Sequence, residues 1–336
     1  FGSESVFNAG YGNNPHVVYD SGNDKAVILF RDGNDGNYGK AIVGTVSGTS
    51  ISFGTEVNFN GNGSTYHFAG AYIGSSKIVV SYYDGSGSGN DGRAKVGTVS
   101  GTSISFGSDA VFNVGQTGQS HYCPCISIGN DKVVIAYQDI GSTSQGAVVG
   151  TVSGTSISFG SATSFGPSAT VYYIDGIYDT VNDKVFMTYR DDANSQYGTS
   201  IIGTVSGTSI SFDSPVVFNT GGTHHMGVGY DSTNDKAVIA YADFGNSNYG
   251  TAIVYSFSTF ATNLTAENYI GIAGEAIANT ATGKINIQGG TNTGQSGLTT
   301  AQTYYVAPTG ILTTTAGTPS VIAGTSISDT KISVRW

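Results

Sequence analysis

The sequence predicts an all-β protein, a six-bladed β-propeller made of four-stranded blades of about 53 residues each. A decapeptide, GTVSGTSISF, begins at Gly44 and recurs unchanged at Gly97, Gly150 and Gly203, always 53 residues apart. A fixed period of this length, made of strand-like segments, is typical of a radial or solenoid array. The 50 glycines, 21 tyrosines and 16 phenylalanines suit short strands joined by tight turns.

The first repeat contains four strand candidates. Residues 16–20 and 25–30 are rich in β-branched and aromatic residues, and the turn at 21–24 joins them into a hairpin. A polar, glycine-rich loop leads to a third strand at 40–46. The turn at 47–49 then leads into a fourth strand at 50–53 that continues to 57–59. Four antiparallel strands in about 53 residues make one propeller blade.

The repeats set the domain boundaries. They cover about 11–60, 64–113, 116–165, 168–219 and 223–269, and the last of these lacks the decapeptide. We expect a divergent sixth blade over 271–309, so that a propeller covers 1–309. Residues 1–8 (FGSESVFN) match the end of a repeat (FGSDAVFN, 106–113), which predicts a fourth strand that closes the sixth blade and removes a free sheet edge. Residues 310–336 are expected to be a C-terminal extension or a hairpin of the last blade.

Composition excludes several classes of function. The 13 Lys and Arg residues against 23 Asp and Glu residues argue against nucleic acid as a partner. No apolar run approaches the 18 residues of a spanning helix, so no membrane insertion is expected. The sequence starts with Phe1 and shows no signal peptide, which suggests a mature product or a piece of a longer chain. Cys123 and Cys125 would share one strand face, where a bridge between them would be strained, so we interpret them as two small side chains.

The repeats differ mainly at one end of the predicted blades. The turns between strands one and two and between three and four are copied, since Asn-Asp-Lys starts at Asn23, Asn130, Asn182 and Asn234. The loops between strands two and three, and those leading into the next blade, vary. Specificity normally lies on variable loops held by a rigid frame, so we expect function at the variable loops.

The variable segments have a biased composition. All five histidines lie just before or within the first strand of a repeat, and the position nine residues before the repeated turn is occupied by planar, hydrogen-bonding side chains. A purely structural position would be expected to keep one residue type. The predicted ligand-binding residues are Asn14, His16, Arg31, Tyr66, His67, His121, Tyr122, Tyr172, Tyr173, Arg190, His224, His225 and Tyr249. Aromatic faces against sugar C–H groups, with polar groups on the hydroxyls, make a saccharide the natural ligand.

Aspartates start the loops after the second strands. Asp32, Asp191 and Asp243 have a simple structural interpretation, because aspartate caps turns by accepting hydrogen bonds from backbone N–H groups. Calcium binding by these loops is left open as a possibility. No other metal and no cofactor is expected.

The sequence favours a protein that is not an enzyme. Only four arginines are present, and Arg31 and Arg190 would lie three blades apart, so a cluster of arginines as in sialidases is not expected. The four glutamates are scattered and form no obvious acid and base pair. A glycosidase that uses the adjacent Asp191 and Asp192 stays open as a less favoured alternative.

The last third of the chain carries a family resemblance. Residues 268–277, 295–298, 303–306, 310–314 and 323–328 together resemble the terminal module of bacteriophage tail-fibre and related virion surface proteins, especially of marine phages. The upstream repeats are similar to repeats of such proteins and of some bacterial surface proteins. The resemblance implies an extracellular or virion-surface protein that recognises host-surface glycans, an adhesin within a larger fibre or assembly. It transfers no catalytic residue.

Two functions from different classes follow from these expectations. The first is a binding propeller on a virion that contacts cell-surface polysaccharide through its variable loops. The second is a structural component of a virion or an extracellular filament, whose repeated faces pack against other subunits.

Overall fold

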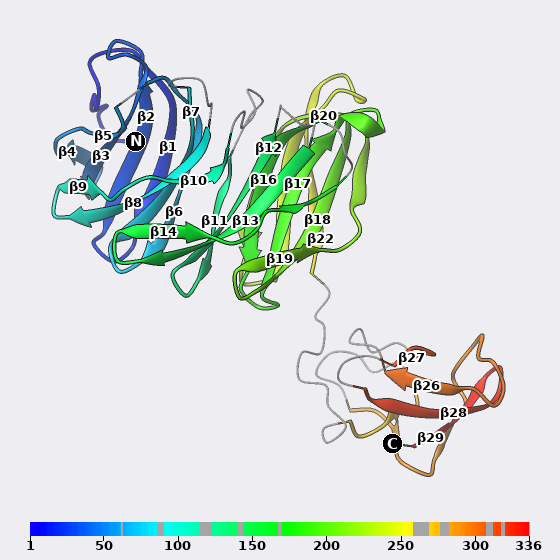
Figure 1. Ribbon diagram of the computed structural model, residues 1–336. Helices are drawn as coiled ribbons and strands as arrows, with labels where there is room; N and C mark the ends of the chain where they lie inside the picture. Colours follow the sequence, from blue (N-terminus) through cyan, green and yellow to red (C-terminus); the bar gives the residue numbers. More distant parts are fainter. Residues whose placement is uncertain are drawn as a thin grey trace. The chain divides into compact units, whose positions relative to one another are not determined.

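The computed structural model describes residues 1–61, 63–85, 91–114, 123–139, 144–166, 170–257, 269–275, 282–306, 312–316 and 320–335 (Figure 1). The chain divides into two compact units, Phe1–Ser256 and Phe257–Trp336. The described residues form β-strands and one short 3-10 turn, Asp192–Asn194, which confirms the all-β prediction. No helix in the described part of the chain could cross a membrane.

The first unit is a row of antiparallel sheets that follow the repeats, and we call them blades 1 to 5. Blade 1 has β1 (Gly12–Asp20), β2 (Lys25–Asp32), β3 (Tyr38–Ser47), β4 (Ser50–Phe53) and β5 (Val57–Asn60). Blade 2 has β6 (Thr65–Gly74), β7 (Lys77–Asp84), β8 (Asp91–Ser100), β9 (Ser103–Phe106) and β10 (Ala110–Asn113). Blade 3 has β11 (Cys125–Gly129), β12 (Lys132–Asp139), β13 (Ser144–Ser153), β14 (Ser156–Phe159) and β15 (Thr163–Ser164).

Blades 4 and 5 share one long strand. Blade 4 has β16 (Val171–Asp179), β17 (Lys184–Asp191), β18 (Tyr197–Ser206), β19 (Ser209–Phe212) and the first part of β20 (Val216–Asp231). Blade 5 has the second part of β20, from Thr223, with β21 (Lys236–Asp243) and β22 (Tyr249–Ser256). The innermost strands of successive blades contact one another in the order β1, β6, β11, β16, β20. This arrangement is the side-by-side packing of propeller blades (Figure 1).

The outer strand of each complete blade is broken in two. In blade 1, β4 pairs with the end of β3 and β5 pairs with its beginning, so both lie on the same edge of that strand. The decapeptide is therefore the hairpin between the third and fourth strands, as predicted. Gly54 follows it directly, and a Cβ at Gly54 would overlap the backbone oxygen of Thr102 in the next decapeptide. The same close approach recurs at Gly107 and Gly160, so the repeated hairpin also fastens one blade to the next.

The register places the copied and varied turns at opposite ends of the blades. The Asn-Asp-Lys turn and the decapeptide turn lie at one end, which we call the repeated end, because Ala26 pairs with Gly44 and Ser47 with Ser50. The starts of the first strands and the loops between second and third strands lie at the other, the variable end, because Gly12 pairs with Asp32.

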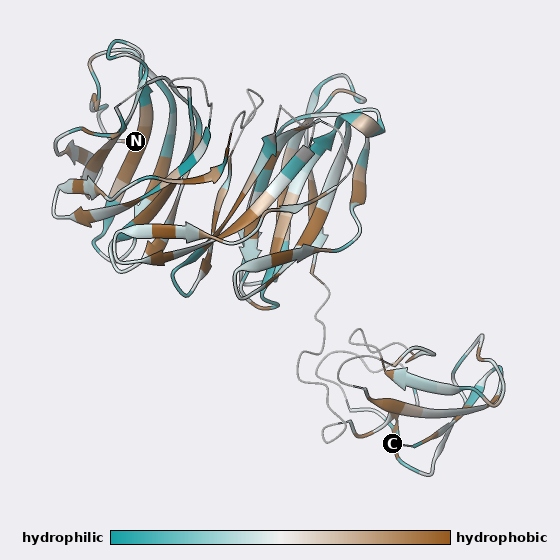
Figure 2. Cartoon of the chain, in the orientation of Figure 1, coloured by the Kyte–Doolittle hydropathy of each residue, from teal (hydrophilic) through white to brown (hydrophobic). Residues whose placement is uncertain are grey.

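The core lies between neighbouring blades, where apolar residues run along the strands (Figure 2). Phe59 of blade 1 contacts Tyr82 and Phe106 of blade 2, with ring centroids 5.4 Å and 6.1 Å away. Phe112 and Phe165 make the same pair of contacts at the next two interfaces, and Phe218 of blade 4 contacts Tyr241. Such aromatic contacts add to the burial of apolar area that stabilises the unit.

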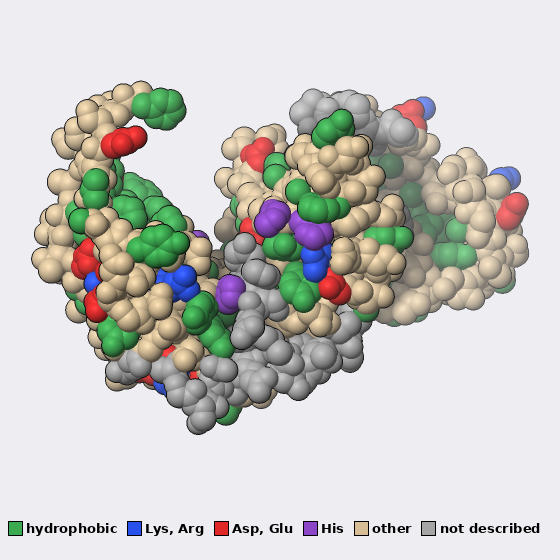
Figure 3. Space-filling view, turned by 90° about the horizontal axis from the view of Figure 1, so that it is seen from above, with side chains coloured by type: hydrophobic (Ala, Val, Ile, Leu, Met, Phe, Trp, Pro, Cys, Tyr) green, Lys and Arg blue, Asp and Glu red, His purple; other side chains and the backbone are tan. Residues whose placement is uncertain are grey.

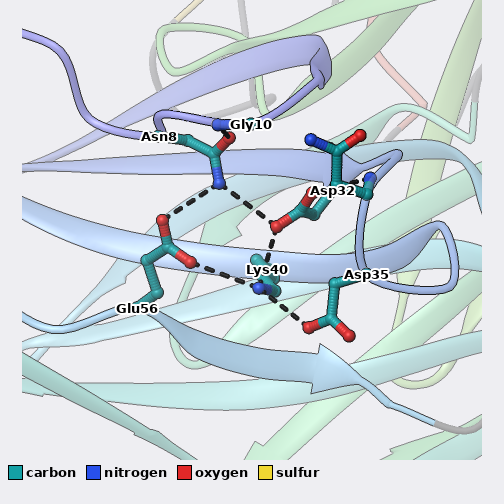
Figure 4. A network of polar contacts seen from close by, with 7 residues as sticks. Asn8, Gly10, Asp32, Asp35, Lys40 and Glu56 are labelled. Atoms are coloured by element: carbon teal, nitrogen blue, oxygen red, sulfur yellow. Dashed lines mark hydrogen bonds and ion pairs between the residues drawn. The ribbon is translucent and has the colours of Figure 1, made fainter.

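Residues 1–8 lie against blade 1. Phe7 contacts Phe30 and Phe53 at 5.1 Å and 6.1 Å. The Asn8 amide donates to Asp32 and Glu56 within a polar network around the Lys40 ammonium (Figure 4). The segment has no assigned strand partner, so its predicted pairing with a last blade is not seen.

The second unit does not confirm a sixth blade over 271–309. Its strands are β23 (Ile272–Ala273), β24 (Ile285–Asn286), β25 (Thr291–Asn292), β26 (Thr303–Val306), β27 (Leu312–Thr313), β28 (Ile322–Ser328) and β29 (Lys331–Val334). β23 and β24 form a two-stranded sheet, and the others form a sheet in the order β25, β29, β28, β26, β27. Residues 310–336, expected to be an extension or a hairpin of the last blade, supply two adjacent inner strands of this sheet, because β28 and β29 form one hairpin around which the shorter strands pair.

Candidate functional site

A β-bulge interrupts the first strand of four blades at the variable end. The register between strands one and two shifts after Asn13, Tyr66, Tyr172 and His224. The next residue, Asn14, His67, Tyr173 or His225, has a φ between 44° and 53°. This left-handed conformation costs a non-glycine residue about 1–2 kcal/mol, and such strain tends to persist at functional positions. Bulges also redirect side chains, here onto the variable end.

The position of the bulge in blade 2 corrects the predicted alignment of Tyr66 and His67 with the other blades. Counting back from the repeated turn aligned Tyr66 and His121 with Asn14, Tyr173 and His225. In blade 2 the bulged residue is instead His67, one position later. The β6–β7 turn has two residues between paired ends, whereas the β1–β2 turn has four, and a second register shift between Tyr72 and Gly74 adds one residue back, so the net change is one position. His121 and Tyr122 lie outside the described residues.

A cluster of aromatic and charged side chains lies where blades 4 and 5 meet at the variable end. Arg190 stacks on the rings of Tyr172 and Tyr173, with its guanidinium carbon 4.3 Å and 5.3 Å from their centroids. Tyr173 lies 4.9 Å from His225 and 5.5 Å from His224 between ring centroids. We call these residues, together with Asp192 and Phe244, the blade 4/5 cluster. Figure 3 shows histidine, basic and acidic side chains close together on this end of the molecule.

Ion pairing fixes the position of the Arg190 guanidinium. Its Nε donates to Asp192 Oδ1 at 2.7 Å, and its Nη2 donates to Asp192 Oδ2 at 3.2 Å. Its Nη1 lies 3.2 Å from His224 Nδ1. Burial, and next the Arg190 cation, lower the pKa of His224, although Asp192 opposes the change. His224 is therefore neutral at pH 7, and it stacks on Phe244 with centroids 4.0 Å apart.

A related but smaller arrangement lies between blades 1 and 2. The guanidinium carbon of Arg31 is 5.0 Å from the Tyr66 ring, and Tyr66 lies 5.8 Å from Tyr83. Arg31 corresponds to Arg190 in strand two, and Tyr66 corresponds to His224 in strand one of the next blade. Unlike Arg190, Arg31 makes no ion pair with a described carboxylate. We call Arg31, Tyr66 and Tyr83 the blade 1/2 cluster.

The bulges also surround a pocket of about 590 Å³ in the first unit. Residues of all five blades line it, which shows that their inner strands converge on one region. Four of the lining residues are polar and the others are apolar. The pocket is lined by Asn14, Pro15, His16, His67, Phe68, Ala69, Pro124, Ile174, Asp175 and Met226.

Asp175 is a pocket residue that the sequence analysis missed. Its carboxylate accepts from the N–H of Gly176 and from the N–H of Val228 in blade 5, both at 2.8 Å. Burial raises the pKa of Asp175, against the effect of these hydrogen bonds and of His16. The sequence does contain a signal for Asp175, because it is the only acid among the five equivalent positions of strand one. The other four are His16, Ala69, Pro124 and Gly227.

The structure thus separates the predicted residues into groups. Asn14, His16 and His67 line the pocket, Arg31 and Tyr66 belong to the blade 1/2 cluster, and five others form the core of the blade 4/5 cluster. Tyr249 belongs to neither cluster, and its side chain is exposed at the start of β22.

The loop aspartates act as turn caps. Asp32, Asp191 and Asp243 each accept from the backbone N–H two residues later at 3.0 Å. Among the described residues, no group of three His, Cys, Asp or Glu side chains is arranged to hold a metal ion. Calcium binding by these loops stays an open alternative.

The two cysteines are not bridged. Cys123 and Cys125 are free thiols, and burial raises the pKa of the Cys123 thiol to about 12. Cys123 is buried and Cys125 is partly buried, and both are small unbridged side chains, in agreement with the sequence interpretation.

Comparison with known proteins gives no family assignment, since no family model and no curated protein matches the chain. Among solved structures, a fungal lectin from Aleuria aurantia, described as a six-bladed β-propeller that recognises fucose, has a TM-score of 0.47 at 13% identity. The match covers 72% of this chain and 78% of the lectin. A prolyl endopeptidase matches with a TM-score of 0.41 at 11% identity, covering 71% of this chain and 32% of that enzyme.

A protein from Lactobacillus plantarum matches with a TM-score of 0.35 at 11% identity, covering 72% of this chain and 84% of that protein. Every one of these TM-scores lies below 0.5, so they supply no evidence for what this chain does. The blade assignment rests on the strand pairing of this chain, and any function rests on its own side chains.

Proposed function

We propose that the chain is a non-enzymatic protein that binds cell-surface glycans at its variable end, mainly through the blade 4/5 cluster. The observation that carries this proposal is the packing of Tyr172, Tyr173 and His225 around a fixed Arg190 guanidinium. Aromatic faces of this kind suit the C–H faces of sugar rings. The guanidinium donates hydrogen bonds, Asp192 accepts them, and a neutral histidine can do either, which matches the hydroxyl groups of a saccharide.

The strained backbone supports the same assignment. Tyr173 and His225 hold positive φ angles although neither is glycine, and the same position is Asn14 in blade 1 and His67 in blade 2. A position that keeps its strain while its side chain varies favours a role in binding over a role in the scaffold.

The engagement of the loop aspartates argues against a glycosidase. Asp191 caps its turn, and Asp192 is paired with Arg190, so the adjacent carboxylates point to different partners. A retaining or inverting mechanism requires two carboxyl groups on either side of one scissile bond.

Placement on a virion or fibre is part of the proposal and rests on the resemblance of the C-terminal third to tail-fibre modules. In that setting the repeated end would face the rest of the assembly and the variable end would face the host surface. A structural role in a virion or filament is the competing interpretation.

Glycan-array binding tests the proposal. The parent chain is expected to bind a subset of surface polysaccharides, and Tyr173→Gly is expected to lose at least about 90% of that binding, an energy loss of about 1.4 kcal/mol. Tyr19→Ala is the matched control, because Tyr19 is an exposed tyrosine near the repeated end. No binding by the parent, or equal binding by both variants, would contradict the proposal.

A further inference from the structure

Blade 5 has no outer strand in the described structure. β22 pairs with β21 on one edge, and no described strand lies on its other edge, where β5, β10, β15 and β20 complete blades 1 to 4. An unpaired edge of this kind is a place where another strand can add. Residues 1–8, by contrast, have the sequence of an outer strand and no sheet of their own.

We propose that the first unit closes as a ring of five blades, in which residues 1–8 form the outer strand of blade 5 and the open face of blade 5 packs on blade 1. No strand of the second unit, from Phe257, is needed to complete this ring. This closure replaces the predicted sixth blade, and it goes beyond the proposed glycan-binding function.

Residues 1–8 already make the contacts that an outer strand makes with the following blade. Phe7 contacts Phe30 and Phe53 as Phe59 contacts Tyr82 and Phe106. A Cβ at Gly2 would overlap the oxygen of Thr49, the approach seen for Gly54 and Thr102.

The polar contacts of the segment agree as well. The Asn8 amide donates to Asp32 at 3.2 Å (Figure 4), as the Asn60 amide donates to Asp84 at 3.1 Å. The Asn219 amide makes the same bond to Asp243 at 3.3 Å. By all three criteria, namely the Phe7 rings, the Gly2 approach and the Asn8 hydrogen bond, residues 1–8 occupy the outer-strand position of the blade that should precede blade 1.

Blades 5 and 1 expose the two halves of a blade interface. Val27 and Val43 of blade 1 are fully buried against blade 2, whereas the equivalent Val238 and Val254 of blade 5 are 40% and 60% exposed. On the opposite side of the interface, Val99 of blade 2 is 3% exposed, whereas its equivalent in blade 1, Val46, is 55% exposed. Joining the two open faces would bury both sets of valines.

The third strand of blade 5 also leaves room for Phe7. At Gly198 in β18, an added Cβ would lie 2.6 Å from the Phe218 ring, and Gly39 in β3 is covered in the same way by Phe59. At Gly250, the equivalent residue of β22, nothing lies within 4 Å of such a Cβ. The space that an outer-strand phenylalanine fills elsewhere is therefore open in blade 5.

The two ends of the row are close enough for closure within one chain. Asn14 and Pro15 of blade 1 line the same pocket as Met226 of blade 5. Because blades 1 and 5 of one chain line the same pocket, the effective concentration of residues 1–8 at the edge of blade 5 is high. Pairing within the chain is therefore favoured over pairing with a second copy. Pairing between chains would instead join blade 5 of one copy to blade 1 of the next and produce an open filament.

A designed disulfide tests the closure directly. In blade 4, Thr199 pairs with Val217, and the same register applied to blade 5 pairs Thr251 with Val6. Opposed residues of antiparallel strands have the Cα separation that a disulfide needs. Under mild oxidation, the Val6→Cys/Thr251→Cys variant should form an intrachain disulfide to the same extent as the control variant Thr199→Cys/Val217→Cys.

Mass analysis and size-exclusion chromatography distinguish the outcomes. An intrachain bond in a monomer supports the proposal. A disulfide between chains, or no disulfide when the control forms fully, overturns it.

A single substitution tests closure if neither double-cysteine variant folds. If Phe7 covers Gly250 in the ring, Gly250→Ala should lower Tm by about 3 °C or more, the same loss expected for Gly198→Ala. Gly227→Ala is the control, because its Cβ also meets nothing within 4 Å and blade 2 has Ala69 at the equivalent position. A Tm for Gly250→Ala equal to or above that of Gly227→Ala would contradict closure. These measurements do not involve glycan, so they succeed or fail independently of the proposed function.

Discussion

The Nη1 of Arg190 lies 3.2 Å from Nδ1 of His224, a close contact between two side chains that can both carry positive charge. The contact is favourable only while the imidazole is neutral and accepts a hydrogen bond from the guanidinium. Burial and the nearby cation both lower the pKa of His224, which keeps it neutral. The blade 4/5 cluster thus holds one fixed cation beside one neutral imidazole.

Replacing Arg190 with glutamine should raise the pKa of His224. The variant removes a cation that lowers this pKa and leaves Asp192, which raises it, without its partner. NMR titration of the imidazole C2–H measures the change, and an unchanged or lower pKa would contradict the assigned contact. Because the folded pKa lies below the unfolded one, the unfolded chain takes up the proton first below about pH 6.5. The His224 contribution therefore lowers the free energy of unfolding of the parent as pH falls through that value. The decrease should be smaller in Arg190→Gln, where the folded pKa is higher.

Glycine at position 173 should be more stable than alanine. Both Tyr173→Gly and Tyr173→Ala remove the ring that packs on Arg190, but only alanine must adopt the φ of 53° with a Cβ. The expected difference in the free energy of unfolding is about 1 kcal/mol in favour of glycine, measured by urea denaturation. Equal stabilities would show that the backbone is not strained there.

The ammonium of Lys40 should be required for the stability of blade 1. It lies 2.9 Å from Asp32 and from Asp35 and 3.3 Å from Glu56, and the Asp32 side chain is only 7% exposed. Lys40→Met should lower the free energy of unfolding by about 3 kcal/mol at pH 7, because it leaves a buried carboxylate without its cation. Lys25→Met is the control, since the Lys25 ammonium donates to backbone oxygens.

The effect of Lys40→Met should shrink in acid. The hydrogen bond from Lys40 lowers the pKa of Asp32 in the folded chain. The stability that Asp32 provides is thus present above its unfolded pKa of about 3.9 and is lost as pH falls through the folded value. Urea denaturation at pH 7 and pH 3 measures this, and an equal loss at both pH values would exclude the ion pair as the cause.

The blade 1/2 cluster should prefer acidic saccharides. Arg31 stacks on Tyr66 and makes no ion pair with a described carboxylate, so its charge is open to one on a ligand. Arg31→Gln should weaken binding of uronic acid-containing glycans at least tenfold and leave binding of neutral glycans within twofold. Parallel titrations with one acidic and one neutral glycan measure the loss of affinity for each. Equal losses for both glycans would contradict the charge preference.

The repeated parts of the fold were predictable because they obey local rules. The 53-residue period located the strands of blades 1 to 4, and the copied turns predicted the repeated end. Aspartate chemistry likewise predicted the caps at Asp32, Asp191 and Asp243. The contact between Gly54 and Thr102, repeated at Gly107 and Gly160, explains why glycine follows the first three copies of the decapeptide, since a Cβ there would meet backbone.

The less regular parts of the fold and of the site could not be predicted from the sequence. The bulge that carries His67 could not be aligned from the sequence, because a shortened turn and an extra bulge residue in blade 2 change the count in opposite directions. Asp175 was missed because only one of the five copies has an acid at that position, and its role depends on Val228 of another blade. The pairing of the second unit depends on contacts between short strands that no period marks.

The measurement that most directly tests the account is calorimetric titration of a glycan selected on the array into the parent, Tyr173→Gly and Tyr19→Ala chains. Binding at the variable end predicts that Tyr19→Ala matches the parent within twofold and that Tyr173→Gly binds at least tenfold more weakly. Equal affinity of Tyr173→Gly and the parent, or a loss confined to Tyr19→Ala at the repeated end, would contradict it.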